Sequence, residues 1–112
     1  MTVRDVLART TAAAGVAAGL TLLARPGQAV ARLAPEYPAD RLWVVRLLGA
    51  RLVGQHAAVL GSPRPPVLRA AAAVDLMHAA TMLPLVRSPR YGRAARISGG
   101  VAATYGVWAS LA

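Results

Sequence analysis

Four long apolar stretches dominate this sequence and restrict the folds that are open to it. They cover about residues 6–24, 42–60, 67–86 and 94–112, and segments rich in proline, glycine and arginine separate them. Each stretch is close to the roughly 20 residues that an α-helix needs to cross a hydrocarbon core of about 30 Å. The runs are too long for strands, and they do not alternate between apolar and polar residues. The 112 residues are therefore expected to form one all-α domain, an integral membrane four-helix bundle.

The breaks between the stretches predict where helices end. Arg25-Pro26-Gly27 closes the first stretch, because proline disfavours a helical conformation in the residue before it. A loop follows, in which the Asp40 carboxylate is expected to cap the second helix. Three prolines between Gly61 and Pro66 enforce a tight break, so the second and third helices should be antiparallel neighbours. Pro84 predicts a kink or an end near the close of the third helix.

A secretory signal is the alternative interpretation of the first stretch. Arg4 and Arg9 precede the apolar run, and Ala29-Val30-Ala31 has the A-x-A form of a cleavage site. However, Arg25 and Pro26 interrupt the sequence between the run and that site, and the rest of the chain is itself apolar. Intact-mass measurement distinguishes the two interpretations.

Arginine supplies all thirteen basic residues, against four acidic ones, and the formal net charge is +9. A basic chain can bind nucleic acid by neutralising phosphates, but these arginines do not form the single stripe of such proteins. Most stand at the ends of the apolar stretches, with a tight group at Arg87, Arg90, Arg93 and Arg96. This placement is typical of membrane anchors, which also attract anionic lipid head groups. The expected partner is a lipid bilayer that includes anionic lipids, with no nucleic acid, and the expected location is the cell membrane.

The distribution of arginine between the short loops predicts the orientation. With four spans, one side of the membrane holds Arg4, Arg9, Arg64 and Arg69. The other side holds Arg25, Arg32, Arg41, Arg87, Arg90, Arg93 and Arg96. Because arginine-rich loops stay in the cytoplasm, both termini are expected on the non-cytoplasmic side.

Polar residues inside the second and third stretches predict an interhelical network. Arg46, Arg51, Gln55 and His56 lie in the second stretch, and Asp75 and His78 lie in the third. An ionisable side chain near the middle of a bilayer is destabilising by about 2.5–3.5 kcal/mol, so such groups turn inward and pair. At 1.5 Å per residue, Arg51 lies roughly 15 Å from the Gly61 turn and Asp75 about 13–14 Å from Pro66. We therefore expect Arg51 to meet Asp75, with His78 and Arg46 extending the network.

This network has a structural and a functional interpretation. A buried ion pair can fix helix register without chemistry, or the same groups can form a proton or ligand site. Axial haem ligation by His56 and His78 is not expected, because their estimated depths, about 7–8 Å and 18 Å, do not match. His56 is instead interpreted as a polar residue near the membrane surface.

The last stretch predicts packing rather than chemistry. Gly99, Ala103, Gly106 and Ser110 recur at steps of three and four residues. Such a stripe of small residues lets helices approach closely, and it is expected to pack within the chain. Tyr105 and Trp108 are expected to be packing or interface-facing aromatics.

No catalytic, metal or cofactor site is expected from the sequence. Cysteine is absent, and no His/Asp/Glu cluster has metal-ligand spacing. No serine stands near a histidine base in the sequence. Gly99-Gly100 lies in an apolar stretch without the lysine of a phosphate loop.

Two segments together carry a resemblance to a known family: Arg46-Leu47-Leu48-Gly49-Ala50-Arg51 and Asp75-Leu76-Met77-His78-Ala79. The pattern resembles that of small actinobacterial membrane proteins of the DoxX-like four-helix type. In that type, a first helix ending near a proline precedes an R-x-x-G-x-R helix, and an aspartate occurs in the third helix. The resemblance covers most of the chain and implies a four-helix membrane fold. It implies no substrate and no catalytic residues.

The sequence thus predicts a small multi-spanning membrane protein. Its expected role is that of a structural or accessory subunit rather than an enzyme, and its expected assembly is a larger membrane complex or a homo-oligomer. The alternative is a carrier or proton-linked binding site centred on Asp75, His78 and Arg51. An enzyme that modifies lipid or quinone has no supporting motif.

Overall fold

The computed structural model describes residues 2–111, and its regular elements over that range are all helical. The four long helices are α1 (Val3–Ala24), α3 (Leu42–Gly61), α4 (Pro65–Met82) and α5 (Gly92–Leu111). A short helix, α2 (Pro26–Leu33), and two 3₁₀ turns, η1 (Ala39–Arg41) and η2 (Leu83–Leu85), lie in the connections. The predicted all-α fold is confirmed, and each long helix coincides with one of the apolar stretches.

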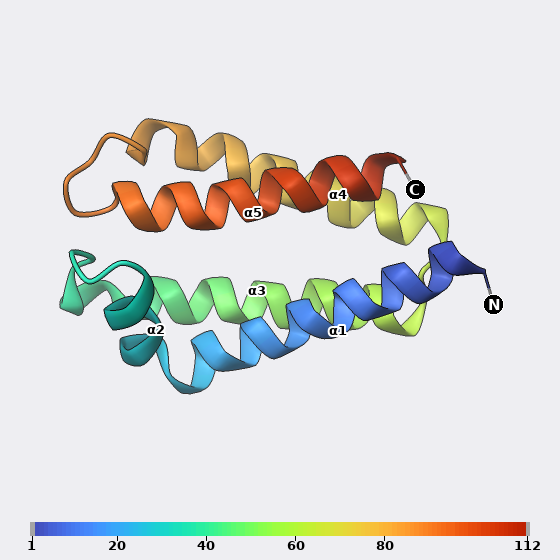
Figure 1. Cartoon of the computed structure of the whole chain (residues 1–112), viewed down its shortest axis with the longest axis horizontal. Helices are drawn as coiled ribbons and strands as arrows, with labels where there is room; N and C mark the ends of the chain where they lie inside the picture. Colours follow the sequence, from blue (N-terminus) through green and yellow to red (C-terminus); the bar gives the residue numbers. More distant parts are fainter. Residues whose placement is uncertain (1, 112) are drawn as a thin grey trace.

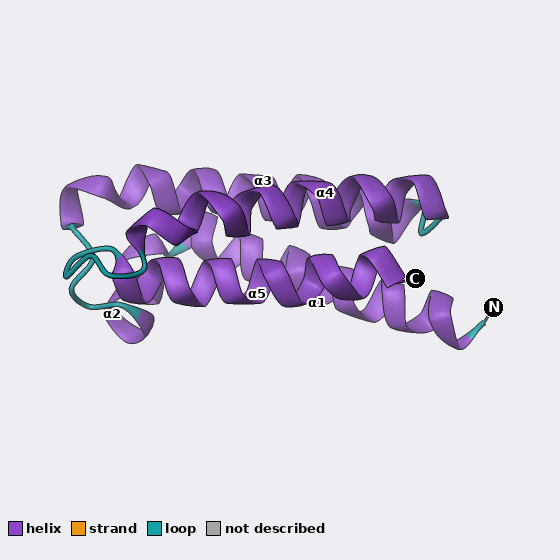
Figure 2. Cartoon of the chain, turned by 90° about the horizontal axis from the view of Figure 1, so that it is seen from above, coloured by secondary structure: helices purple, strands orange, loops and turns teal. Residues whose placement is uncertain are grey.

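The long helices run alternately in opposite directions along the molecule (Figure 1). α1 packs along α3, and α4 packs along α5, so the bundle consists of two helix pairs. Both termini and the α3–α4 turn lie at one end, which we call the termini end (Figure 1). α2 and the α4–α5 loop lie at the other end, which we call the α2 end. Seen from above, α3 and α4 occupy one layer and α1 and α5 the other (Figure 2).

Local sequence signals explain most helix ends. The Thr2 hydroxyl accepts a hydrogen bond from the Asp5 amide, and the Asp5 carboxylate accepts one from the Thr2 amide, which together form a capping box. Pro65 occupies the first turn of α4, where its missing N–H costs nothing. The predicted break at Pro84 takes the form of η2 directly after α4.

Asp40 does not cap α3, contrary to the sequence-based prediction. The helix begins at Leu42 without a side-chain cap, and Asp40 is exposed within η1. Because a 3₁₀ turn precedes the helix directly, Asp40 lies inside that turn rather than at the residue before α3.

The segment after α1, which the sequence led us to expect as a loop, contains α2. Pro26 ends α1 but also begins the new helix, because a proline at the first helical position has a favourable φ. Ala29 and Val30 face the interior, whereas Gln28 and Arg32 are exposed. The Ala29-Val30-Ala31 motif of the possible cleavage site is therefore helical.

Glycines set the closest approach within each helix pair. A Cβ atom at Gly49 of α3 would lie 2.7 Å from the carbonyl oxygen of Gly19 in α1. On α5, a Cβ atom at Gly99 would lie 3.0 Å from Met82, and one at Gly106 would lie 2.9 Å from Leu76. The predicted small-residue stripe thus packs on α4 in the same chain. Ala103, its third member, is half-buried, and Ser110 is exposed.

Among residues 2–111, one helix, α1, is long and apolar enough to cross a bilayer by length and composition. Signal sequences and the buried core helices of soluble proteins share that property. Only 17% of the apolar window of α1 is buried in the structure, so α1 is not the covered centre of this fold.

Candidate functional site

A cavity of about 920 Å³ lies between the two helix pairs. All five α-helices contribute to its wall, and most of the lining side chains are apolar. The lining includes Arg51, His56, Asp75 and His78, together with the phenols of Tyr37, Tyr91 and Tyr105. The cavity forms because α1 packs on α3 and α4 on α5 much more closely than one pair packs on the other.

Arg51, Gln55 and Asp75 form a hydrogen-bonded cluster across the α3–α4 contact. The Asp75 side chain is almost fully buried, with 2% of the residue exposed. Arg51 Nη1 lies 3.4 Å from Asp75 Oδ1, and Gln55 Nε2 donates to Asp75 Oδ2 at 2.8 Å. Arg51 Nη1 also donates to Gln55 Oε1 at 2.7 Å. The structure therefore brings together the two residues that their equal depth predicts to meet, and it adds Gln55.

The network predicted from the sequence omits Gln55, although the distance of Gln55 from Arg51 along the chain indicates that the two side chains are neighbours. It stands four residues after Arg51, so both side chains lie on one face of α3. Depth counted from the turn gives the height of a residue but not the direction in which its side chain points.

Arg46 lies outside the cluster, which corrects the prediction that it extends the network. It is exposed on α3. The five residues between Arg46 and Arg51 correspond to about 140° of rotation at 3.6 residues per turn, so the two side chains point to different faces.

His78 lies on the cavity wall, one turn after Asp75, and is half-buried. Its Nε2 atom is buried and has no hydrogen-bond partner within the described chain. The structure thus places His78 beside the cluster without bonding it to Asp75 or Arg51.

His56 is buried rather than near the surface, contrary to its interpretation from the sequence. Only 4% of the residue is exposed, and its ring covers Gly15 of α1. The Tyr105 ring stands edge-on to it, with ring centroids 4.7 Å apart. The Tyr105 hydroxyl lies 3.3 Å from the Thr11 hydroxyl. The sequence does not predict this contact between α1, α3 and α5. Nothing in the sequence distinguishes a glycine that packs against a ring of another helix, as Gly15 does, from any other small residue.

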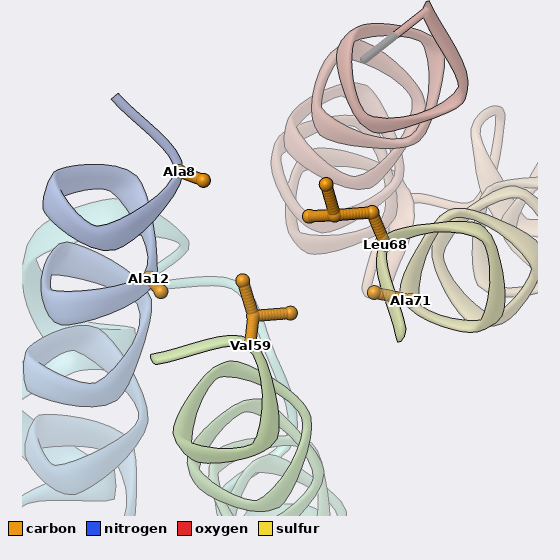
Figure 3. Packing of buried hydrophobic residues seen from close by; sticks show 5 residues of the cluster. All are labelled: Ala8, Ala12, Val59, Leu68 and Ala71. Carbon is orange, nitrogen blue, oxygen red and sulfur yellow. The ribbon is translucent and has the colours of Figure 1, made fainter. Parts of the chain in front are cut away.

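An apolar cluster closes the bundle beyond His56, toward the termini end. Ala8, Ala12, Val59, Leu68 and Ala71 are its buried members, and Val67 and Trp108 pack against it. The five buried side chains converge from α1, α3 and α4 on the space between the helices (Figure 3). The cavity therefore ends at this cluster, with its polar side chains near the closed end.

At the α2 end, the two helix pairs are joined by polar and aromatic contacts. Arg93 Nε lies 3.4 Å from Glu36 Oε1. The Tyr37 and Tyr91 rings meet edge-to-face at 5.5 Å, and the Tyr37 hydroxyl donates to the Arg41 carbonyl at 3.0 Å. Burial raises the pKa of the Tyr37 phenol above its ordinary value, so the hydroxyl stays protonated and keeps this donor bond at neutral pH.

The fold and this cavity define an up-and-down helical bundle with a partly open, mostly apolar site between its helix pairs that carries a few polar groups. No group of three or more metal-ligating side chains is found within residues 2–111. Comparison with protein-family models, with curated proteins and with solved structures found no match to this chain. Its function is therefore argued from the geometry of the cavity.

Proposed function

We propose that this chain is a multi-pass membrane protein whose four long helices cross the bilayer, and that the cavity between the helix pairs binds an apolar ligand. The observation that carries the binding proposal is the cavity of about 920 Å³, which lies within the range of small-molecule sites, about 300–1,000 Å³. Its wall holds Arg51, Asp75 and His78 among apolar side chains. The binding proposal corresponds to the alternative function predicted from the sequence, a binding site centred on these three residues.

The outer surface supports the membrane part of the proposal. Leu20, Leu47, Met77 and Val107, one from each long helix, are between 52% and 68% exposed. The same bundle buries Asp75 and His56. In soluble domains, carboxylates are mostly exposed and large apolar side chains are most often buried. The reverse arrangement is stable where lipid surrounds the helices and polar groups pair inside.

α3, α4 and α5 are less apolar than α1, the one helix that meets the length and composition of a span within residues 2–111. In α3 and α4, part of the polar content faces the bundle, because Gln55, Asp75 and His78 line or adjoin the cavity. Bundle-facing polar residues lower the mean hydropathy of a helix without placing charge in contact with lipid.

The exposed arginines of the α2 end support an anionic lipid partner. Arg87, Arg90, Arg93 and Arg96 are all exposed around the α4–α5 loop and the start of α5. Side chains of this length can reach head groups from a helix end, and each contributes about 1 kcal/mol of attraction to an anionic surface.

A structural or accessory role in a larger membrane complex or a homo-oligomer stays a prediction, as does the resemblance to DoxX-like proteins. Purification in mild detergent distinguishes the roles. Recovery of a stoichiometric larger complex favours the accessory subunit, and ligand binding by the isolated chain favours the binding site.

The membrane proposal is tested by fractionation of untagged protein. We expect the chain to stay in the membrane pellet after washing with alkaline carbonate and to enter the soluble fraction only with detergent. Intact mass should equal that of the full sequence, because α1 is proposed to remain as the first span. A folded monomer in plain buffer after ultracentrifugation would overturn the proposal.

The binding proposal is tested on purified protein with tritiated methyl palmitate and tritiated palmitic acid in a scintillation proximity assay. We expect saturable, displaceable binding of at least one probe. Ser98→Phe places a large ring at a residue that lines the cavity and should reduce binding at least tenfold. Val107→Phe is the matched control on the exposed outer side of α5 and should bind normally. Absence of saturable binding, or equal binding by both variants, would reject the cavity as the site.

A further inference from the structure

The polar side chains at the closed end of the cavity define what kind of head group a ligand can place there. Three of them have a buried nitrogen without a hydrogen-bond partner in the described part of the chain: Arg51 at Nε, His56 at Nδ1 and His78 at Nε2. Buried polar atoms normally find partners, and each one left unpaired is destabilising by about 1–3 kcal/mol. His56 Nδ1 faces Gly15 of α1, whereas Arg51 and His78 both line the cavity beside Asp75. Arg51 Nε and His78 Nε2 are therefore the two nitrogens that one ligand group in the cavity can serve.

The charges around these nitrogens already balance. The Arg51 guanidinium faces the Asp75 carboxylate, and both carboxylate oxygens accept hydrogen bonds, one from Arg51 and one from Gln55. An ionised head group beside them would add a third charge to a pair that is already balanced, which is unfavourable in a mostly apolar cavity. Arg41, the other arginine of the wall, is placed at the α2 end and is exposed. A ligand that fits this wall is therefore neutral at its head.

The unpaired atoms also set the hydrogen-bond character of the head group. The Arg51 Nε–H can only donate, whereas each imidazole nitrogen can donate or accept according to its tautomer. A head group must therefore accept at Arg51, and a carbonyl oxygen with two lone pairs can accept from Arg51 and one histidine together. Most of the rest of the wall is apolar and continues toward the α2 end, so the body of the ligand is apolar.

We propose that the cavity recognises a neutral lipid whose carbonyl oxygen accepts hydrogen bonds from Arg51 Nε and His78 Nε2, with its apolar chain extending toward α2. This inference rests on the proposed binding function and specifies its ligand class. An ester and a ketone both provide a neutral carbonyl oxygen, and separate probes distinguish these two classes of ligand.

The test compares four C16 to C17 probes in the same competition assay: methyl palmitate, 2-heptadecanone, palmitic acid and hexadecane. The acid is assayed at about pH 10, where it is ionised even though contact with detergent raises its pKa above the ordinary carboxyl value near 4. We expect the ester or the ketone to bind at least tenfold more tightly than both palmitate and hexadecane. Equal or tighter binding of palmitate or of hexadecane would overturn the inference while leaving the binding proposal intact. Saturable binding of none of the four would overturn both.

Two substitutions assign the effect to the named atoms. Arg51→Lys keeps a cation for Asp75 but removes the Nε–H, and His78→Phe keeps a ring but removes its nitrogens. Each should weaken binding of the preferred carbonyl probe about tenfold, the effect of losing one buried hydrogen bond, and leave hexadecane binding unchanged. Arg46→Lys, on the exposed side of the same helix, is the control and should bind all probes normally.

Thermal unfolding of each variant separates loss of the site from loss of the fold. If Arg51→Lys does not fold, the affinity of His78→Phe for the carbonyl probe is the deciding measurement. Carbonyl-probe affinity that stays at the wild-type value in the folded variants would overturn the assignment.

Discussion

At the scale of single residues, Asp75 is the side chain that joins α3 to α4. Its oxygens accept from Arg51 and Gln55, and Asp75 is far more buried than Arg51: the two side chains are 3% and 25% exposed. The carboxylate thus depends on protein partners, while the guanidinium retains some access to the surroundings. Removing the carboxylate charge leaves Arg51 without a counter-ion, whereas neutralising both members leaves an amide network.

Asp75→Asn should accordingly lower the stability of the folded chain by roughly 3 kcal/mol, as expected when one partner of a buried pair is lost. The double variant Arg51→Gln/Asp75→Asn should recover part of that loss. Thermal unfolding in detergent, followed by circular dichroism at a helix wavelength, measures both. Arg46→Gln, at an exposed position, is the control and should change stability by less than about 0.5 kcal/mol. A stability of Asp75→Asn equal to that of the control would show that the pair contributes nothing.

The sequence predicts the pairing of Arg51 with Asp75, because both depths are counted from the same tight turn. Depth does not fix rotation about the helix axis, so equal depth wrongly adds Arg46 to the network and omits Gln55. The predicted position of His56 is wrong for a different reason. Its burial depends on Gly15 of α1, and the sequence does not indicate which glycine faces which ring.

At the scale of elements, glycines decide how closely the members of each pair approach. Gly19 and Gly49 lie where α1 meets α3, and Gly99 and Gly106 lie where α5 meets α4. In a membrane, close backbone approach is a main source of helix association, because apolar side chains gain little by leaving lipid. The two pairs are therefore expected to be the most stable units of the fold.

Gly49→Ala tests this expectation. The added methyl would lie 2.7 Å from the Gly19 carbonyl oxygen, so α1 and α3 would have to separate. A loss of about 1–3 kcal/mol is expected, the usual effect of overpacking. Gly54→Ala on the same helix meets no atom within 4 Å and should not destabilise the chain, since alanine favours helix. The two unfolding curves are compared directly; equal midpoints would mean that the glycine contact does not limit helix packing.

The helices themselves were predictable because their signals are local. Prolines at 26, 65 and 84 stand at boundaries that the structure also shows. α2 escaped prediction because Pro26 both ends one helix and begins another, and a proline in the sequence does not distinguish the two roles. Asp40 was assigned to a cap for a similar reason, because an intervening 3₁₀ turn leaves no mark in residue type.

At the scale of the whole molecule, the cavity is the feature that the sequence could not provide. Its existence depends on the distance between two helix pairs, which is set by contacts at the ends. Thr11, His56 and Tyr105 meet near the closed end, and Glu36 and Arg93 meet at the α2 end. Each of these contacts joins residues from distant segments of the chain that no local pattern relates.

The two ends of the bundle also differ in charge, which bears on its orientation in a membrane. The α2 end carries Arg25, Arg32, Arg41, Arg87, Arg90, Arg93 and Arg96, with Glu36 and Asp40. The termini end carries Arg4, Arg9, Arg64 and Arg69, with Asp5. The arginine counts are seven and four. Acidic residues contribute little to topology, so the excess of arginine predicts that the α2 end is cytoplasmic.

A reporter enzyme that is active only in the cytoplasm measures this orientation. Fused to the C-terminus, it should be inactive, and inserted in the loop between η2 and α5 it should be active. Arg87→Ala/Arg90→Ala/Arg96→Ala lowers the α2-end count to four, equal to the other end, and keeps the Arg93–Glu36 contact, so the C-terminal fusion should gain activity in part of the population. This response ties the orientation to the arginines themselves, because these exposed side chains lie outside the cavity wall. Strong activity of the wild-type C-terminal fusion would reverse the assignment and place the α2 end outside the cytoplasm.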